Sequence, residues 1–366
     1  MSADRPPDDD LANVPTDWFI YRGAGRPVMD VSLLETLPPP PPWRDFKGEP
    51  VLQPPPEDLA DLDRRLGPVA LVPPHLPASG QEVVAVNVAL CLRRPLLVTG
   101  PPGVGKSTLA YQVSRELRLG PVLRWPINSR TTLRSGLYEY DAIARVQDAR
   151  WRAESPSAGP EDPDDNRERD IGDYMQLGPL GTALLPYELP RVLLIDEFDK
   201  SDPDLANDLL DVFEEGSYQI PELCRIRSRV DTVVVGTADG ERTATIQKGV
   251  VTCRAFPFIV ITSNGERDLP PAFLRRCVQL TMPEPSADRL AALLAARFSQ
   301  SSEPYMEQLI RDFLEYRSRQ PVAADQLLNA LYLAIQGQVN PSDMDDASWR
   351  QVLDVVLHRL DSAGTG

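Results

Sequence analysis

The sequence predicts an α/β protein with a largely parallel sheet in a three-layer core, followed by an all-helical C-terminal domain. Three observations predict this fold. Short apolar segments alternate with helical patterns in the middle of the chain, a glycine-rich turn joins one of these segments to a helix, and residues 285–366 have helical periodicity alone. With 366 residues the chain can form two or three domains around a well-buried core.

The core domain is expected over residues 81–284. Its apolar strand candidates are residues 95–99, 122–125, 192–195 and 256–262. Before the first strand, a helix is predicted with Val84, Val88 and Leu92 on one face. Residues 232–253 predict a hairpin that turns near Asp239-Gly240. The stretch from Asp148 to Asp173 is acidic and broken by proline, which indicates a solvated insertion or a mobile loop.

Residues 1–80 form a proline-rich N-terminal extension. Proline donates no backbone hydrogen bond, so we expect neither regular helix nor central strand there. Aromatic residues at this density indicate that the extension docks, either on its own core or on a neighbouring subunit. They are Trp18, Phe19, Tyr21, Trp43 and Phe46.

The C-terminal domain is expected to contain four helices. Their predicted ranges are residues 287–298, with Ser286 as the N-cap, 306–319, 323–336 and 347–360. Each carries apolar residues at helical spacing, and together they would form a small helical bundle.

Composition excludes several classes of protein. No apolar run approaches the 20 or so residues that cross a bilayer, and the acidic, proline-rich start lacks the apolar core of a signal peptide, so we expect a cytoplasmic protein without a membrane span. A net charge of −16 disfavours nucleic acid as a partner. The four cysteines lack C-x-x-C spacing, and His75 and His358 are the two histidines, so we expect buried, reduced thiols and no zinc site.

A phosphate-binding loop is predicted directly after the first strand. Glycine lets backbone N–H groups surround phosphates at a helix N-terminus, a lysine neutralises the terminal phosphates, and a serine hydroxyl binds Mg²⁺. A chance glycine-rich turn would not also have the strand before it and the helix behind it, so the pattern predicts ATP and Mg²⁺ as cofactors. The residues are Gly100, Pro101, Pro102, Gly103, Val104, Gly105, Lys106 and Ser107, with Thr108 next to them.

Two acids end a later apolar strand. Asp196 is predicted to bind magnesium together with Ser107, and Glu197 to activate the attacking water as a general base. The alternative is an acidic helix start, because Asp202-Pro203 begins a helix just beyond.

Polar residues also follow the fourth strand. Asn264 would reach the γ-phosphate and the lytic water, because ligands collect at the carboxyl ends of parallel strands, although a lone asparagine there is more often a turn residue. Arg275 and Arg276 end a short helix. They could stabilise the transition state in a neighbouring subunit or simply complement the helix dipole, and local sequence does not decide between these roles.

These segments resemble the AAA+ superfamily and, within it, the MoxR-like ATPases. GPPGVGKST, VLLIDEFDK and FPFIVITSNGERDLPPAFLRRC occur in the family's order, followed by a helical lid, and the resemblance covers about residues 80–340. It implies an ATP hydrolase with Asn264 as sensor 1 and Arg276 as the arginine finger, with Arg275 as a neighbouring candidate. An insertion at about 138–180 and the hairpin at 232–253 match features of the family.

The resemblance also implies partners. It implies self-association into a hexameric ring, and chaperone-like remodelling beside a partner protein with a von Willebrand factor A domain. One family feature is missing, because the stretch PVAADQLL at 321–328 has no sensor 2 arginine; Arg317 or Arg319 would have to replace it. Two alternatives therefore stay open, a nucleotide-gated scaffold or sensor with negligible hydrolysis and a nucleic-acid-directed motor.

Overall fold

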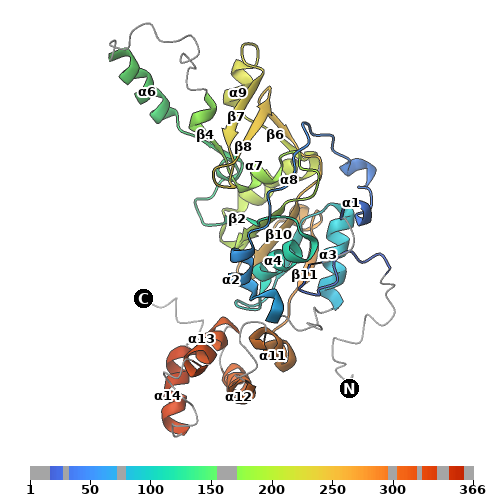
Figure 1. The fold of residues 1–366 in the computed structure, drawn as a ribbon, viewed down its shortest axis with the longest axis vertical. Helices are drawn as coiled ribbons and strands as arrows, with labels where there is room; N and C mark the ends of the chain where they lie inside the picture. The colour runs from blue at the N-terminus through green and yellow to red at the C-terminus, as the bar shows by residue number, and fades with distance from the viewer. Residues whose placement is uncertain are drawn as a thin grey trace.

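The protein consists of an α/β body, a second sheet at one end of that body and a group of C-terminal helices at the other end (Figure 1). We describe it from a computed structural model. The description covers residues 17–27, 33–71, 80–154, 171–295, 303–319, 324–335 and 346–357.

The central sheet is parallel and has the strand order β11-β1-β10-β5-β2. Alternate residues of its apolar strands point to opposite faces, as the pleat of a sheet requires. Leu193 of β5 packs into one hydrophobic cluster and Leu194 into the other, so both faces are covered. The predicted α/β class with three layers is confirmed. The strands are β1 Leu96–Thr99, β2 Leu123–Pro126, β5 Val192–Asp196, β10 Phe258–Ser263 and β11 Val278–Thr281.

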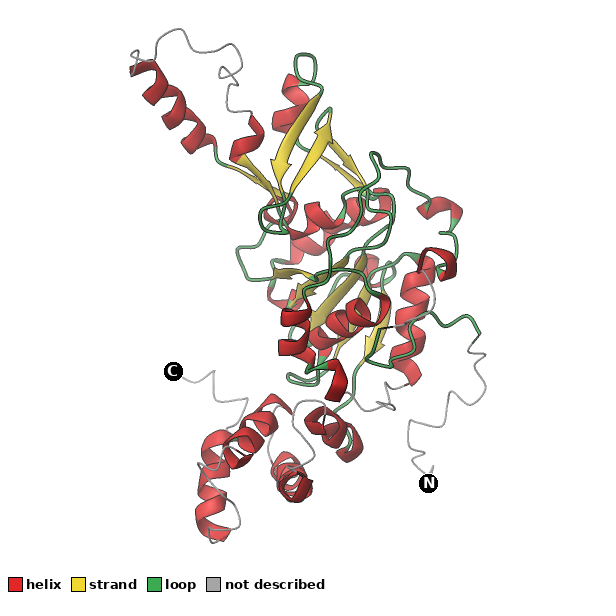
Figure 2. Cartoon of the chain, viewed as in Figure 1, coloured by secondary structure: helices red, strands yellow, loops and turns green. Residues whose placement is uncertain are grey.

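Helices cover both faces of this sheet (Figure 2). On one face lie α3 (Gly80–Leu92) and α4 (Lys106–Leu117). The other face packs against α7 (Pro179–Ala183), α8 (Pro203–Glu215) and α10 (Pro271–Leu274), with α5 (Leu133–Leu137) and the short helix η5 (Phe198–Lys200) beside them. The helix predicted before β1 therefore exists.

The face of α3 that carries Val84, Val88 and Leu92 is not its most buried side. Val84 and Val88 are only half-buried and Leu92 is 40% exposed, whereas Val86 and Leu90 are buried. Asn87 is also fully buried, because its side-chain amide binds the backbone of the N-terminal segment. The helix is covered on more than one side, so a single apolar stripe did not identify its orientation.

A second sheet has the strand order β3-β4-β7-β8-β9-β6 and extends away from the body. The turn predicted near Asp239-Gly240 lies between β7 and β8, which pair in antiparallel register from Thr232↔Gln247 to Gly236↔Thr243. The strands are β3 Tyr138–Tyr140, β4 Met175–Leu177, β6 Ser217–Gln219, β7 Thr232–Gly236, β8 Thr243–Gln247 and β9 Val250–Thr252, with α9 (Pro221–Ile226) alongside.

The stretch between Asp148 and Asp173 is not uniformly loop. Its first residues belong to the helix α6 (Ala142–Glu154), and its last form the short helix η4 (Ile171–Tyr174). Ile143 and Trp151 of α6 are more than 70% exposed, which agrees with a solvated position for this insertion. Residues 155–170 lie outside the described part of the chain.

The N-terminal extension docks on its own core at several points. Asn87 accepts the N–H of Tyr21, whose ring is buried, and Glu116 accepts the N–H of Arg22. Phe46 packs against the core, whereas Trp43 is 72% exposed. The expectation that this region forms no regular helix was wrong, because the segment between its proline runs is free of proline and Asp58 caps it. Its helices are α1 (Leu33–Thr36), η2 (Pro42–Arg44), α2 (Leu59–Leu66) and η3 (Val69–Leu71).

The C-terminal region is helical throughout its described residues. Ser286 caps the first helix, because its hydroxyl accepts the backbone N–H of Arg289 at 3.3 Å. The four helices pack around a separate hydrophobic cluster that includes Phe313 and Leu331. They are α11 Ala287–Ala295, α12 Glu303–Arg319, α13 Ala324–Ile335 and α14 Asp346–Val356.

The described cysteines form no disulfide. Cys253 and Cys277 are buried, and burial raises the pKa of each thiol to about 12. Cys91 and Cys224 are only half-buried, so the prediction of buried thiols is confirmed for two of the four. The helices of the described residues include none with the length and apolarity needed to cross a bilayer. His75 and His358 lie outside the described residues.

A buried ion pair fixes the second sheet to the body. The guanidinium of Arg191, just before β5, donates to both carboxylate oxygens of Asp239 at 2.7 and 2.8 Å, and to the carbonyl of Pro121 at 3.0 Å. Arg191 is fully buried and its guanidinium lies 5.0 Å from the centre of the Tyr187 ring. The pair therefore joins the β7–β8 turn to the start of two central strands.

Removing one partner of this pair should destabilise the fold strongly. We expect Asp239→Ala to lower the free energy of unfolding by about 3–5 kcal/mol, because it leaves a buried guanidinium without its counter-ion. Denaturant unfolding measures this. The matched control is Asp231→Ala, whose partner Lys248 lies 3.9 Å away on the exposed surface; it should change stability by less than about 0.5 kcal/mol. Equal effects of the two substitutions would contradict the structural role of the buried pair.

Candidate functional site

The glycine-rich loop lies between β1 and α4 and depends on glycine for its backbone. Gly100, Gly103 and Gly105 have φ values of 150°, 77° and 97°. At Gly100 a Cβ would also lie 2.4 Å from the carbonyl oxygen of Met282. At Gly105 a Cβ would meet nothing closer than 4.0 Å, so glycine is needed there for its conformation. The loop thereby presents the N-terminus of a 12-residue helix at the end of the sheet.

Lys106 begins α4 and is buried, with 8% of its surface exposed. Its ammonium group donates to the carbonyls of Gly100 and Pro101 and to the side-chain oxygen of Asn264, at 2.7, 2.8 and 2.7 Å. Burial lowers the pKa of Lys106, and the nearby acids, Asp199 first, oppose this shift. These three acceptors match the three N–H donors of a lysine. An anion bound in the loop would therefore have to replace one or more of them as a partner of Lys106.

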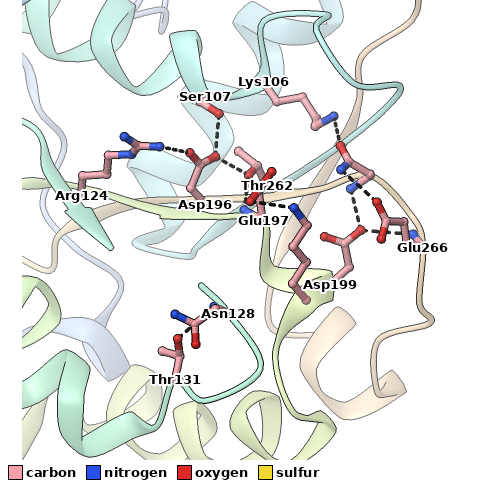
Figure 3. A network of polar contacts seen from close by, with 12 residues as sticks. Lys106, Ser107, Arg124, Asn128, Thr131, Asp196, Glu197, Asp199, Thr262 and Glu266 are labelled. Carbon is pink, nitrogen blue, oxygen red and sulfur yellow. Dashed lines mark hydrogen bonds and ion pairs between the residues drawn. The ribbon is translucent and has the colours of Figure 1, made fainter. Parts of the chain in front are cut away.

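Asp196 is the centre of the polar network (Figure 3). Its Oδ1 accepts hydrogen bonds from the hydroxyls of Ser107 at 2.6 Å and Thr262 at 2.8 Å, while its Oδ2 accepts from Arg124 at 3.0 Å. Burial alone would raise the pKa of Asp196, but these hydrogen bonds outweigh it and lower the pKa. The carboxylate is therefore held in its charged form.

The oxygen atoms beside the loop fit Mg²⁺. The metal is bound in nucleotide sites by one or two protein oxygens, phosphate oxygens and waters, rather than by a complete cage of side chains. Ser107 and Asp196 supply such a pair on adjoining elements. Within the described residues, no cluster of three or more histidine, cysteine or acidic residues could form a protein-only metal site.

Glu197 follows in a left-handed backbone conformation, with φ of 61°. This conformation is unusual for a residue other than glycine, and the N–H of Glu197 is held by the hydroxyl of Thr262 at 2.9 Å. The side chain is half exposed and pairs with Lys200 at 2.9 Å. The turn thus directs the two consecutive acids differently, Asp196 into the network and Glu197 toward solvent.

The alternative role for Asp196 and Glu197 was to begin a helix, but other residues begin it. Asp202 caps α8 by accepting the N–H of Asp204 at 3.0 Å, and Pro203 is its first residue. The acids at the end of β5 are thus not needed as helix caps.

Asn264 lies beside the loop, as β10 is between β1 and β5. Its side-chain oxygen accepts from Lys106, and its backbone N–H donates to Asp199 at 2.9 Å. Asp199 is 2% exposed and also accepts the N–H of Glu266 at 3.1 Å. One acid of the β5 turn therefore fixes the backbone that carries Asn264.

The two arginines lie apart from this network. Arg276 donates from Nε to Glu214 at 2.7 Å and from a terminal nitrogen to the carbonyl of Ala272 at 3.1 Å. Arg275 is exposed, and its carbonyl accepts from Arg94. The contacts of the described residues do not bring either side chain to Lys106, Asp196 or Glu197 of the same chain. Within one subunit the site is assembled without them.

The candidates for sensor 2 are placed differently. Arg317 pairs with Glu284 at 3.2 Å and donates to the carbonyl of Pro285 at 2.8 Å, at the connection between β11 and α11. It therefore ties α12 to the segment that enters the C-terminal domain. The side chain of Arg319 lies outside the described part of the chain.

Sequence reasoning missed several residues of the network, among them Arg124, Thr262 and Asp199. Thr262 could have been found, because strand alternation places it on the same face as Asn264. Arg124 is a single charge in an otherwise apolar strand candidate, which was a weak signal. Nothing local distinguishes Asp199 from the other acids that follow β5.

Comparison with known proteins identifies a family. Residues 95–277 match the model of the AAA domain (dynein-related subfamily), which is 183 of the 366 residues. The match runs from the residue before β1 to the residue after Arg276. No curated protein matches the chain.

Thr262 is expected to hold the acidic turn through its hydroxyl. Thr262→Val keeps the shape but leaves the N–H of Glu197 and an oxygen of Asp196 without this partner, so we expect a loss of about 1–3 kcal/mol in unfolding free energy. Thr262→Ser should restore most of it. The control Thr245→Val, on the exposed face of β8, should change stability by less than about 0.5 kcal/mol. A Thr262→Val protein as stable as its serine counterpart would refute this role.

Proposed function

This chain belongs to the AAA domain family (dynein-related subfamily), and we propose that it hydrolyses ATP at subunit interfaces of a ring. The observation that carries the proposal is the convergence of Lys106, Ser107, Asp196 and Asn264 at one end of the sheet. They come from the ends of two strands, β5 and β10, and from the N-terminus of α4, at the edge where open parallel sheets bind ligands.

Binding of ATP would use the loop and the start of α4. Backbone N–H groups of residues 100–107 would surround the phosphates, and Lys106 would exchange carbonyl contacts for phosphate oxygens. Ser107 and Asp196 would hold Mg²⁺, which screens the phosphate charge when bound. The short contact between these two oxygens and the lowered pKa of Asp196 support this assignment.

Hydrolysis would need a water beside the γ-phosphate and a group that accepts its proton. We assign the proton acceptor to Glu197, whose carboxylate is half exposed next to the network and pairs with Lys200. The water oxygen forms a bond to the γ-phosphorus, the bond from phosphorus to the β,γ-bridging oxygen breaks, and ADP leaves with that electron pair. Asn264 would orient the water, because its side chain is freed when Lys106 moves to the phosphates.

The missing positive charge would come from a neighbouring subunit. Among the described residues, the arginine that contacts this network is Arg124, on Asp196, whereas Arg276 lies at the end of α10, anchored through Glu214. The helix α10 also contacts the turn after β5 in the same chain, because the rings of Phe198 and Phe273 stack with their centres 5.1 Å apart. We therefore propose that Arg276 acts in trans, with Arg275 as the alternative.

The finer assignment is a MoxR-like remodelling ATPase. The order of motifs, the insertion between β3 and β4 and the β7–β8 hairpin before β10 support it. We infer a hexameric ring that acts on a partner protein in a chaperone-like way. The mass of the assembly gives the number of its subunits. A protein with a von Willebrand factor A domain is the partner that this assignment implies.

One observation favours a second function. Arg317 pairs with Glu284 beside the domain connection, so the nearest candidate for sensor 2 has a structural partner. A nucleotide-gated scaffold would bind ATP and release little phosphate. Steady-state phosphate release by the wild-type chain separates this reading from hydrolysis.

Binding and hydrolysis should be separable by substitution. Lys106→Ala should abolish ATP binding, whereas Glu197→Gln should bind ATP and lose turnover by roughly 10²-fold or more, the scale of a lost acid–base group. Nucleotide binding and phosphate release measure the two effects. Lys47→Ala and Glu215→Gln, on the exposed surface, are the matched controls and should behave like the wild type. Unchanged turnover in Glu197→Gln would exclude Glu197 as the base.

The shared site can be tested by mixing variants. Arg276→Ala and Glu197→Gln should each be inactive alone, but a mixed ring contains interfaces that pair an intact Glu197 with an intact Arg276, so activity should return. Arg275→Ala in the same assay identifies which arginine reaches the phosphate. If mass measurement confirms mixed assemblies and no activity returns, the site is not shared between subunits.

A further inference from the structure

Arg124 is a cation inside the nucleotide site that the proposed mechanism does not use. It lies on β2, the edge strand of the central sheet, where Leu123 and Trp125 point into the core and Arg124 points to the other face. Its side chain is 50% exposed, whereas the side chain of Asp196, with which it pairs, is 11% exposed. A half-exposed charge thus contacts a buried one.

The two oxygens of Asp196 have different partners. Oδ1 accepts from the hydroxyls of Ser107 and Thr262, and Oδ2 accepts from Arg124 alone among the described contacts. The hydroxyl groups are neutral, so Arg124 provides the counter-charge for this buried carboxylate. A divalent cation approaching Asp196 would meet the guanidinium at the oxygen that the two hydroxyls leave accessible.

Arg124 also has room to leave Asp196. It lines a pocket of about 410 Å³ at the β2 edge, together with Asp58 and Arg242. Asp239 lines the same pocket but is occupied by Arg191. The Asp58 side chain caps α2 through one oxygen, so its charge remains available to a guanidinium that turns toward the pocket.

We propose that Arg124 is an internal counter-ion of Asp196 that competes with Mg²⁺, and so sets the magnesium concentration at which ATP binds tightly. The inference rests on the proposed assignment of Asp196 as the magnesium-binding acid. Arg124 acts through Asp196 and is a positioning residue. Its charge, rather than its shape, carries the effect, because a divalent cation and a guanidinium cannot both neutralise one carboxylate oxygen without repulsion.

The test is a magnesium titration of ATP binding to the full chain. The affinity for a fluorescent ATP analogue is measured from EDTA through increasing MgCl₂, and the magnesium concentration at the midpoint is compared between variants. Arg124→Gln should lower the midpoint roughly 2- to 5-fold, the scale of a half-exposed ion pair. Arg124→Lys keeps the charge and should stay near the wild type. Arg130→Gln, an exposed arginine on the loop after β2, is the matched control.

A second readout does not involve nucleotide. Thermal unfolding in EDTA should occur at a lower temperature for Arg124→Gln than for the wild type, and MgCl₂ should raise the unfolding temperature of the variant more. An unchanged or higher magnesium midpoint in a folded Arg124→Gln protein would overturn the inference. If magnesium leaves ATP binding by the wild type unaffected, the metal assignment of the proposed function fails instead.

Discussion

The carboxylate of Asp196 is the constraint on which the site depends. It is buried at the end of β5, and a buried charge is stable in a protein only when it is paired and hydrogen-bonded. Its three partners come from α4, β10 and β2, so one acid holds together the helix after the glycine-rich loop, the neighbouring strand and the edge strand of the sheet. The groups that surround Asp196 at the expected magnesium site thus also provide the hydrogen bonds and the counter-charge that its buried carboxylate needs.

The residues beyond Asp196 link the nucleotide site to the proposed subunit interface. Glu197 has a left-handed backbone conformation, and its N–H donates a hydrogen bond to the hydroxyl of Thr262. Asp199 accepts the backbone N–H of Asn264. Phe198, between the two acids, stacks on Phe273 of the arginine-bearing segment. Because this core is close-packed, a shift of the acidic turn would displace α10, which gives a physical path between the proposed hydrolytic site and the proposed subunit interface.

The N-terminal extension also contacts the arginine segment. Arg44 is buried, binds the carbonyl of Phe213 and pairs with Glu214 at 3.1 Å, and Glu214 is the acid that anchors Arg276. Two cations from distant parts of the sequence therefore share one carboxylate. This part of the proline-rich region is therefore packed onto the α/β body.

The sequence by itself determined the parallel α/β class, four of the five described strands of the central sheet and the residues at their ends. Apolar runs and the spacing of Lys106, Asp196 and Asn264 are local properties, and parallel strands bring their carboxyl ends to one edge whatever the side chains around them. The sequence also predicted the turn between β7 and β8, because its residues have turn propensity of their own. The roles of the site residues remain predictions.

Only the tertiary structure decided which residues complete the network. Arg124 and Thr262 are separated from Asp196 by 72 and 66 positions, and no periodicity within one segment encodes such contacts. The burial of the polar residue Asn87 in α3 has a related cause. Asn87 and the proline-rich segment bury each other through hydrogen bonds, so their burial follows from packing between distant parts of the chain rather than from local hydrophobicity.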